Sequence, residues 1–432
     1  MSQIHFVHTT DWHLGFYQYN KPERFTDYFN AATKAIDKII EINPQFVLHT
    51  GDIFHHAKPA PATIRQAVQL LQKLDQANIP MYIVRGNHDG KNSVYLRRGG
   101  GIISLLKDFE LLRYVNDEII QIDDLPCQLM GVGYYPGTLV VKKIDAILSS
   151  SDKLTASSDY KIIAIHAFVE GQLEETSQIS LKKISSLGID YLAAGHYHKP
   201  WMDDKKKVYA PGSTEMTAIS DATRDDNIDG VSLYSTMFEV KATTMADEWQ
   251  HEVIPHKIAV RPKIMLNYRS EMKSTETIRD ELEQKIEEKI DVILLNEPSV
   301  AELQPILSVD LKTDLAFEEY SQLYIEEWYQ DEFLHIITNI DGKTNSMNIT
   351  ADLGQSFHRE EVILELIEAY DLDKDKHATM IMELLEDYSD QPKSRDLADD
   401  VFNDITKLIL EQPRDQKHVE DGTTEQYKLE DF

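Results

Sequence analysis

Cysteine, long apolar runs and basic residues are all scarce in this chain of 432 residues. The single cysteine, Cys127, excludes an internal disulfide and fits a reducing compartment. No apolar run approaches the ~20 residues that a membrane-spanning helix needs, so we expect no membrane partner. The first residues also lack the basic and then apolar pattern of a secretion signal. These absences predict a cytoplasmic protein.

Basic residues are outnumbered, because 44 Lys+Arg stand against 74 Asp+Glu and give a formal net charge of −30 at pH 7. Most of the excess lies late in the chain: residues 251–432 hold 19 Lys+Arg and 43 Asp+Glu, whereas residues 1–250 hold 25 and 31. The overall field therefore does not steer the chain to nucleic acid. Any contact with DNA would depend on a local basic groove or on bound metal ions.

Short apolar runs alternate with helical patterns through the first half of the chain. This βαβ order predicts a layered α/β domain over residues 1–250. The runs are 5–9, 46–50, 81–84, 161–166 and 191–196, with helical patterns at 22–42 and 62–78.

Three further segments follow this domain. Strand and helix patterns predict a small α/β domain over residues 256–346. Apolar stripes at helical spacing predict a helical segment over residues 355–412. Residues 413–432 are polar and acidic, and we expect them to be disordered.

Each of the five apolar runs ends in side chains that bind hard or borderline metal ions. In HTTDWHLG, at residues 8–15, alternation places Asp11 and His13 on the same face of an extended segment. Loops at the carboxyl ends of strands in an open α/β sheet line its ligand crevice, so these groups are predicted to meet on one rim. The set comprises Asp11, His13, Asp52, Asn87, His166, His196 and His198.

Seven oxygen and nitrogen ligands suit two metal ions better than one. One ion takes about four protein ligands with a position left open, so two ions that share a carboxylate would use all seven. Gly51, Gly86 and Gly195 directly precede ligand residues, where we expect sharp turns with positive φ. Each signal is common by itself: a lone histidine usually lies in a core or on a surface, and GD or GNH is ordinary turn chemistry. Their combination in strand-end order predicts a two-metal hydrolase.

The combined pattern DWH, GD, GNHD, His166 and GHYH resembles the calcineurin-like metallophosphoesterases. The words TTDWHLG, LHTGDIFHHAKP, GNHD and YAPGSTE are similar to those of one subgroup, the SbcD-type or Mre-like DNA double-strand-break repair nucleases. The resemblance is dense over residues 4–215 and only architectural beyond them. It implies an α/β fold, a two-sheet metallophosphoesterase sandwich flanked by helices. A small α/β capping domain that contacts DNA and a C-terminal helical segment would follow.

The resemblance also implies roles for individual residues. One Mn²⁺ would be held by Asp11, His13, Asp52 and His198, and a second by Asp52, Asn87, His166 and His196, with Mg²⁺ as an alternative ion. The two ions would activate a water for in-line attack on phosphorus. His88 would stabilise charge or protonate the leaving oxygen, and His55 would position the DNA end. We interpret the neighbouring His56 as a surface histidine.

This subgroup resemblance predicts a manganese-dependent DNA exonuclease and single-strand or hairpin endonuclease of a double-strand-break repair complex at the nucleoid. Its partners would be DNA, a second copy of this chain, and an SMC-like ABC ATPase of the SbcC/Rad type that binds residues 355–412. A small-molecule phosphodiesterase or phosphatase would need the same metal site, and a non-catalytic scaffold the same fold. His55, the second domain and the helical segment favour the nuclease. The basic loops 97–101 and 205–207 are either DNA contacts or solvated turns.

Overall fold

The structure is a computed structural model, and the part of it described here lies in the first of the chain's two units, Met1–Met347. None of the helices in that part is long and apolar enough to cross a bilayer. The predicted segments 355–412 and 413–432, and most of the loop 97–101, lie outside the described residues. The described residues are 2–90, 101–150, 154, 158–173, 177–221, 227–246, 248–316, 323, 325, 329 and 331–343.

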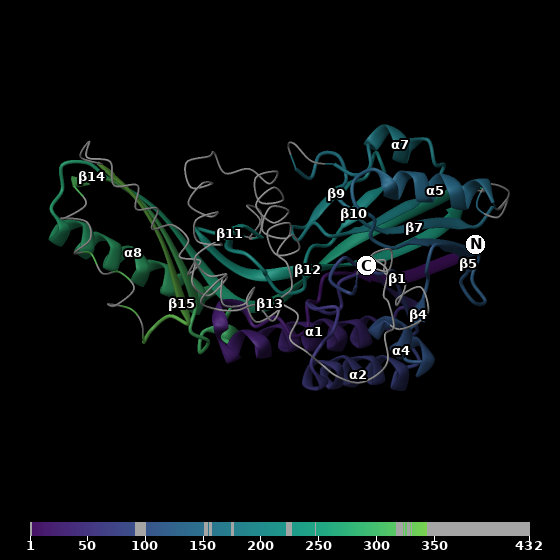
Figure 1. Cartoon of the computed structure of the whole chain (residues 1–432), viewed down its shortest axis with the longest axis horizontal. Coiled ribbons are helices and arrows are strands. Elements are labelled where there is room, and N and C mark those ends of the chain that lie inside the picture. Colours follow the sequence, from purple (N-terminus) through teal and green to yellow (C-terminus); the bar gives the residue numbers. More distant parts are fainter. Residues whose placement is uncertain are drawn as a thin grey trace, which may run out of the picture. The chain divides into compact units, whose positions relative to one another are not determined.

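The larger of two sheets runs through the whole described unit (Figure 1). Its strands lie in the order β15-β14-β13-β12-β1-β2-β3-β4, with β11 paired to β12. β1 to β4 run parallel to one another, β12 is antiparallel to both β1 and β13, and β13 to β15 are parallel again. The strands are β1 (Gln3–Thr9), β2 (Phe46–His49), β3 (Met81–Ile83), β4 (Arg113–Tyr114), β11 (Asn227–Ile228), β12 (Val231–Met245), β13 (Glu248–Ser270), β14 (Ile306–Ala316) and β15 (His335–Lys343).

The smaller sheet has the order β5-β6-β7-β8-β10-β9 among the described residues. β6, β7, β8 and β10 are parallel, and the two edge strands are antiparallel to their neighbours. These strands are β5 (Glu118–Gln121), β6 (Cys127–Val132), β7 (Tyr160–His166), β8 (Tyr191–Gly195), β9 (Trp201–Asp203) and β10 (Val208–Ala210).

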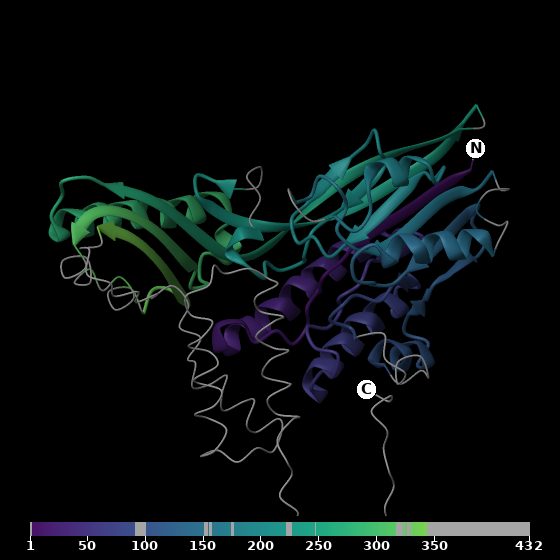
Figure 2. The same cartoon turned by 45° about the horizontal axis from the view of Figure 1, so that its top comes forward.

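The two sheets pack face to face and helices cover their outer faces (Figure 2). Between the sheets, side chains such as Phe6 and Leu48 meet Ile162 and Ala193. On the far side of the larger sheet lie α1 (Pro22–Ile42), α2 (Pro61–Gln76) and α4 (Ile102–Asp108), and on the far side of the smaller sheet lie α5 (Leu139–Ser149) and α7 (Leu181–Ser185). The predicted two-sheet sandwich flanked by helices is confirmed.

Local sequence explains these elements. In β1 the alternation sends Phe6 between the sheets and Val7 toward the helices, so both faces of the strand are buried. Pro22 occupies the first turn of α1, where a missing N–H costs nothing, and Asn43 ends the helix in a left-handed conformation. The helix over 22–42 forms as predicted, and the second begins one residue earlier than expected, at Pro61.

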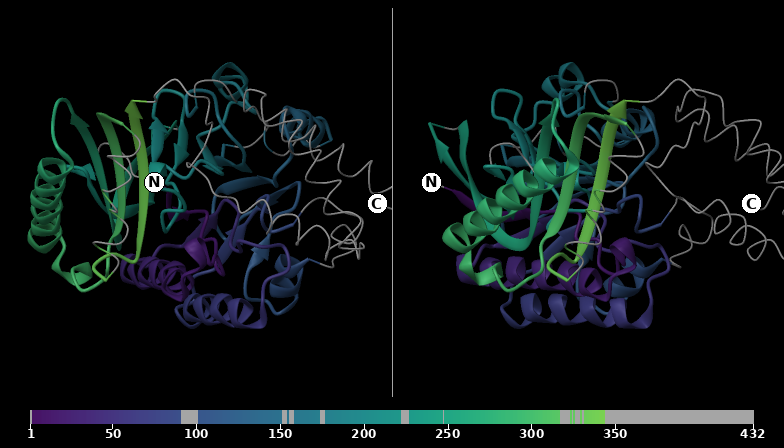
Figure 3. Two further views of the ribbon diagram at one scale, coloured as in Figure 1. Left: turned by 60° about the vertical axis from the view of Figure 1, so that its left-hand side comes forward. Right: turned by 90° about the vertical axis from the view of Figure 1, so that its left-hand side faces the viewer.

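The predicted capping region extends the larger sheet. β13 is one continuous strand over Glu248–Ser270. Its first part pairs with β12, and its last part pairs with β14. α8 (Thr275–Asn296) lies across these strands (Figure 3), and Ile278 and Leu282 pack against Leu266 of β13. The side chain of Ser274 caps the helix by accepting a hydrogen bond from the Thr277 N–H. Short 3-10 turns complete the fold: η1 (Gln18–Asn20), η2 (Ile219–Asp221) and η3 (Pro298–Val300).

A buried cluster of charges joins α1, the loop after β10 and β13. Arg24 donates to Asp27 (2.8 Å) and Glu215 (3.0 Å), and Arg261 donates to both oxygens of Asp27 (2.6 and 2.9 Å). Lys263, which is fully buried, donates to the Met216 carbonyl (2.6 Å). Two guanidinium groups are thus matched by two carboxylates, and Lys263 is the extra cation. Burial and the nearby Arg24 lower the pKa of Lys263 from 10.5 to about 7.

Replacing Lys263 by Met is expected to raise the free energy of unfolding by ~1–4 kcal/mol near neutral pH, because it removes a buried unmatched cation. Between pH 7 and 10.5 the unfolded wild-type chain binds a proton at Lys263 that the folded chain does not, so wild-type stability rises with pH. The advantage of Lys263→Met should therefore be largest below pH 7 and shrink toward pH 10.5. Denaturant unfolding of both proteins across this range measures it, and an advantage that grows with pH would contradict the prediction.

Candidate metal centre

The predicted ligand residues follow the ends of five strands from both sheets. Asp11 and His13 follow β1, Asp52 follows β2, and Asn87 follows β3. The smaller sheet contributes His166, the last residue of β7, and His196 and His198 directly after β8. Because these strands end at the same edge of the sandwich, all seven residues meet on one rim, as the sequence predicts.

The ligand atoms fall into two groups in which all atoms lie within 4.8 Å of one another. One group is Asp11, His13 and His198, and the other is Asp52, His166 and His196. Asp52 stands between them, since its Oδ2 lies 3.9 Å from His13 Nε2 and 3.3 Å from His166 Nε2. Asn87 joins the second group through its Oδ1, 2.9 Å from His166 Nε2. This geometry supports two cation positions with Asp52 shared.

The two buried carboxylates have the polar atoms that a cation would satisfy. Asp11 Oδ2 accepts hydrogen bonds from the Thr10 hydroxyl (2.8 Å) and the His196 N–H (3.1 Å), and Asp52 Oδ1 accepts one from the His88 N–H (2.8 Å). Their other oxygens, Asp11 Oδ1 and Asp52 Oδ2, are buried without a hydrogen-bond partner among the described residues. A buried oxygen of this kind is costly unless something pairs with it. Two such oxygens beside imidazole nitrogens fit divalent ions of the borderline class.

Electrostatics in the metal-free chain couple Asp52 to His166. Burial alone would lower the pKa of His166, but Asp52 beside it and the Thr50 carbonyl raise that pKa to about 9. Burial alone would raise the pKa of Asp52, yet His166 and His13 bring it below its ordinary value. A histidine binds a metal ion only when it is neutral, so a cation would have to displace the proton of His166.

Predicted ligand residues carry the strained backbone of this site. Four of them have positive φ: Asp11 (51°), His13 (46°), Asp52 (57°) and His196 (83°). Such conformations cost of order 1–3 kcal/mol each and concentrate at functional sites. Of the three glycines expected to have positive φ, only Gly51 does (103°). For Gly86 and Gly195 that expectation is wrong. Glycine is needed at these two positions because a Cβ would overlap neighbouring atoms.

Gly86 has no room for a methyl group, because a Cβ there would overlap the carboxylate and backbone N of Asp52. Gly86→Ala is therefore expected to lower the free energy of unfolding by ~1–3 kcal/mol, as overpacking does, and to weaken Mn²⁺ binding by displacing Asp52. Gly188→Ala is the control, since a Cβ at Gly188 meets nothing within 4 Å although its φ is 62°. The control should lose some stability through strain and keep its Mn²⁺ affinity in calorimetry. Equal metal affinities in both variants would contradict the prediction.

His88 and His55 lie beside the metal positions, on the His13 side. His88 Nδ1 donates to the His55 carbonyl (2.8 Å), and the two rings stack with centroids 4.9 Å apart. The His55 ring also stacks on Phe16, at 3.7 Å. Burial and the neighbouring His88 lower the pKa of His55 to about 3, so His55 is neutral at physiological pH. His56 is exposed, in agreement with its interpretation as a surface histidine.

Three supporting residues had no predicted role. Asp89, the last residue of GNHD, is buried and accepts from the N–H groups of Asp52 (2.8 Å), Gly86 (2.9 Å) and Phe54 (3.1 Å). An acidic residue directly after a Gly-Asn-His turn is a signal for such loop bonding. Thr217 and Asp221 contact His198, and no motif in the sequence marks them because loop geometry alone brings them there.

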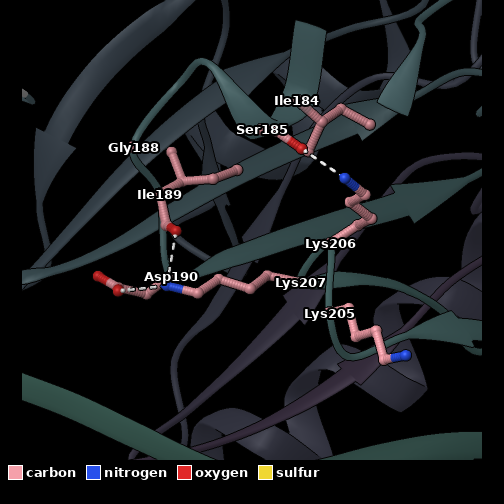
Figure 4. Close-up of a pocket in the computed structure, with 8 residues that line it drawn as sticks. All are labelled: Ile184, Ser185, Gly188, Ile189, Asp190, Lys205, Lys206 and Lys207. Atoms are coloured by element: carbon pink, nitrogen blue, oxygen red, sulfur yellow. Dashed lines mark hydrogen bonds and ion pairs between the residues drawn. The ribbon is translucent and has the colours of Figure 1, made fainter. Parts of the chain in front are cut away.

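Lysines 205–207 line a pocket of about 310 Å³ that contains none of the predicted ligand residues (Figure 4). Lys206 donates to the Ser185 hydroxyl (3.3 Å), and Lys207 donates to the Ile189 carbonyl (3.1 Å) and Asp190 (3.2 Å). These lysines precede β10, which is parallel to β8, whereas His196 follows β8. The lysines therefore lie at the opposite ends of these strands from the metal centre.

The chain is similar to several known proteins. Residues 4–200 match the family model described as calcineurin-like phosphoesterase. The DNA double-strand break repair protein Mre11 of Methanococcus maripaludis is 30% identical over 245 residues, which cover 54% of this chain and 62% of that protein. A protein of the same name from Saccharolobus solfataricus is 24% identical over 428 residues, 94% of this chain and 98% of that one. A solved dimetal phosphatase from Danio rerio is 12% identical with a TM-score of 0.37, covering 60% of this chain and 99% of that chain.

The match with the Methanococcus maripaludis protein spans less than two thirds of that protein's length. The family match runs from β1 to just beyond β8 and contains all seven predicted ligand residues and the GNHD turn. Residues 4–200 of this chain are therefore a calcineurin-like metallophosphoesterase domain.

Proposed function

We propose that this chain is a two-metal phosphodiesterase that cleaves DNA in double-strand-break repair. The observation that carries the proposal is the pair of ligand groups that share Asp52, with His88 and His55 beside them. Relatives named as DNA double-strand break repair proteins support DNA as the substrate, among them one aligned over 94% of this chain.

The ligand set would divide as the two groups do. Asp11, His13 and His198 would hold one ion, His166, His196 and Asn87 the other, and Asp52 would bridge them. Divalent ions bound there would lower the pKa of a water and offset negative charge on the phosphoryl oxygens. Mn²⁺ fits this mixed set of carboxylate, amide and imidazole ligands, with Mg²⁺ as the alternative.

The residues beside the ligands would handle protons and orientation. The Nδ1–H of His88 is donated to the His55 carbonyl, so a proton given to a leaving oxygen would come from Nε2 of the imidazolium form of the ring, which would then be left neutral with its Nδ1–H in place. His55 is neutral and stacked between Phe16 and His88, which suits it to positioning rather than to carrying charge. Both roles require a substrate phosphate on the His13 side of the centre.

The DNA cleavage proposed is exonucleolytic on duplex ends and endonucleolytic on hairpins. The alternative is a phosphodiesterase that acts on small molecules. The full chain would be assayed with Mn²⁺ on hairpin and blunt duplex DNA and on bis-p-nitrophenyl phosphate. We expect DNA cleavage that needs Mn²⁺ and is absent from Asp52→Asn. Hydrolysis of the small ester without DNA cleavage would favour the alternative. No hydrolysis of either would refute the proposal.

Partners are proposed for two other regions. Residues 355–412 would bind an SMC-like ABC ATPase, and helices of the first domain would form a homodimer. The chain cut after residue 352 should still hydrolyse a small phosphodiester with Mn²⁺ but fail to co-purify with the ATPase. An unchanged affinity for the ATPase would contradict this assignment, as would loss of hydrolysis from the cut alone.

A further inference from the structure

The second ring nitrogen of His198 is held by side chains, whereas Nδ1 of His166 is held by the backbone carbonyl of Thr50. His198 Nδ1 lies 2.5 Å from the hydroxyl oxygen of Thr217 and 3.5 Å from Asp221 Oδ2. The Thr217 hydroxyl in turn lies 2.6 Å from the same Asp221 oxygen. Imidazole, hydroxyl and carboxylate thus form one chain of contacts on the side of His198 that faces away from Asp11.

The protons in this chain can be placed in only one consistent way. An ionised carboxylate only accepts, so the single hydroxyl proton of Thr217 is donated to Asp221. The hydroxyl oxygen then has only lone pairs left for His198, and Nδ1 must carry the proton. The lone pair of the neutral ring is therefore on Nε2. That atom lies 3.7 Å from Asp11 Oδ1 and 3.2 Å from His13 Nε2, where the first metal position is proposed.

Buried side chains also hold the backbone around Thr217. Gln18 donates to the Thr217 carbonyl, and Arg24 (3.0 Å) and Lys263 (2.6 Å) donate to the carbonyl of Met216. Asp221 also accepts from the N–H groups of Thr217 (2.9 Å) and Ala218 (2.8 Å). The Thr217 hydroxyl is consequently presented to His198 from a fixed position.

We propose that Thr217 and Asp221 are positioning residues for His198, which fix its Nδ1–H tautomer and aim its Nε2 at the ion held with Asp11 and His13. This inference rests on the proposed two-metal function. It adds a carboxylate, Asp221, that acts on His198 through the hydroxyl of Thr217. Partners that orient a ligand histidine typically change metal affinity by 10–100-fold when removed.

Thr217→Val separates this role from support of the loop. The substitution keeps the shape of the side chain and the two N–H bonds to Asp221, and replaces the hydroxyl by a methyl group that cannot hydrogen-bond. Thr217→Ser restores the hydroxyl. Asp221→Asn keeps the size of the carboxylate but removes its charge. Asp229→Asn is the matched control, because Asp229 is 72% exposed and bonds only to Lys289 among the described residues.

The experiment is calorimetric titration of the full-length variants with Mn²⁺, together with thermal unfolding of the metal-free proteins. In Thr217→Val and Asp221→Asn we expect one of two sites to weaken by about 10–100-fold and the other to stay unchanged. Thr217→Ser and Asp229→Asn should bind as wild type does. Unchanged affinities in Thr217→Val would overturn the inference, as would joint loss of both sites or loss of the cooperative unfolding transition. Failure of the wild-type chain to bind two ions would instead refute the two-metal function.

Discussion

Asp52→Asn is expected to remove nuclease activity and to weaken both metal positions together. Asp52 Oδ2 lies 3.3 Å from His166 Nε2 in one group and 3.9 Å from His13 Nε2 in the other, so its charge acts on both metal positions. We expect each Mn²⁺ affinity to fall by more than ~100-fold, the upper range for partners that only support a ligand. Activity should fall below detection because neither position then binds Mn²⁺ at the concentrations used in the assay.

The fold should survive this change. Asn keeps the oxygen that accepts from the His88 N–H, and it tolerates the left-handed backbone at this position, where φ is 57°. Asp229→Asn makes the same chemical change at a residue with φ of 51° that lies away from the centre, and should behave as wild type. Calorimetry with Mn²⁺ and a cooperative unfolding transition test both parts. Near-wild-type turnover in Asp52→Asn would contradict the two-metal proposal.

His88→Leu is expected to lower the cleavage rate by roughly 10²–10⁴, the range for one general acid, while both ions stay bound. His88 belongs to neither of the two groups that contain a carboxylate. Its backbone N–H, which holds Asp52, is unaffected by the substitution. The rate of DNA cleavage at saturating Mn²⁺ and the number of ions bound therefore separate chemistry from metal binding.

The control for this variant is His56→Leu, because His56 is the exposed neighbour of His55. It should cleave DNA at the wild-type rate. His88 does lie within ligand distance of His13 and His55, so the count of ions is decisive. Loss of one Mn²⁺ in His88→Leu would make His88 a ligand and would overturn its assignment as proton donor.

The amino-acid sequence by itself was sufficient for the layered fold and for the set of polar side chains that the structure brings together on one rim. Period-2 and period-3.6 apolar patterns identify strands and helices, and parallel strands bring their carboxyl ends to one edge. Asp11, His13, Asp52, Asn87 and the three later histidines could therefore be placed on one rim from the sequence. The sequence does not predict the continuity of β13, because an apolar pattern does not say which strands pair.

Only the tertiary structure decided which loops support the ligands and where backbone strain lies. The contact of Thr217 and Asp221 with His198 joins a loop after β10 to a loop after β8, and no periodic pattern encodes such a meeting. Gly86 is needed because Asp52 approaches it closely, a property of two loops rather than of one. Asp11 and His13 take up left-handed conformations that no pattern in the sequence predicts. Local sequence specifies which chemical groups are delivered to the rim, while packing between distant segments specifies how each group is aimed.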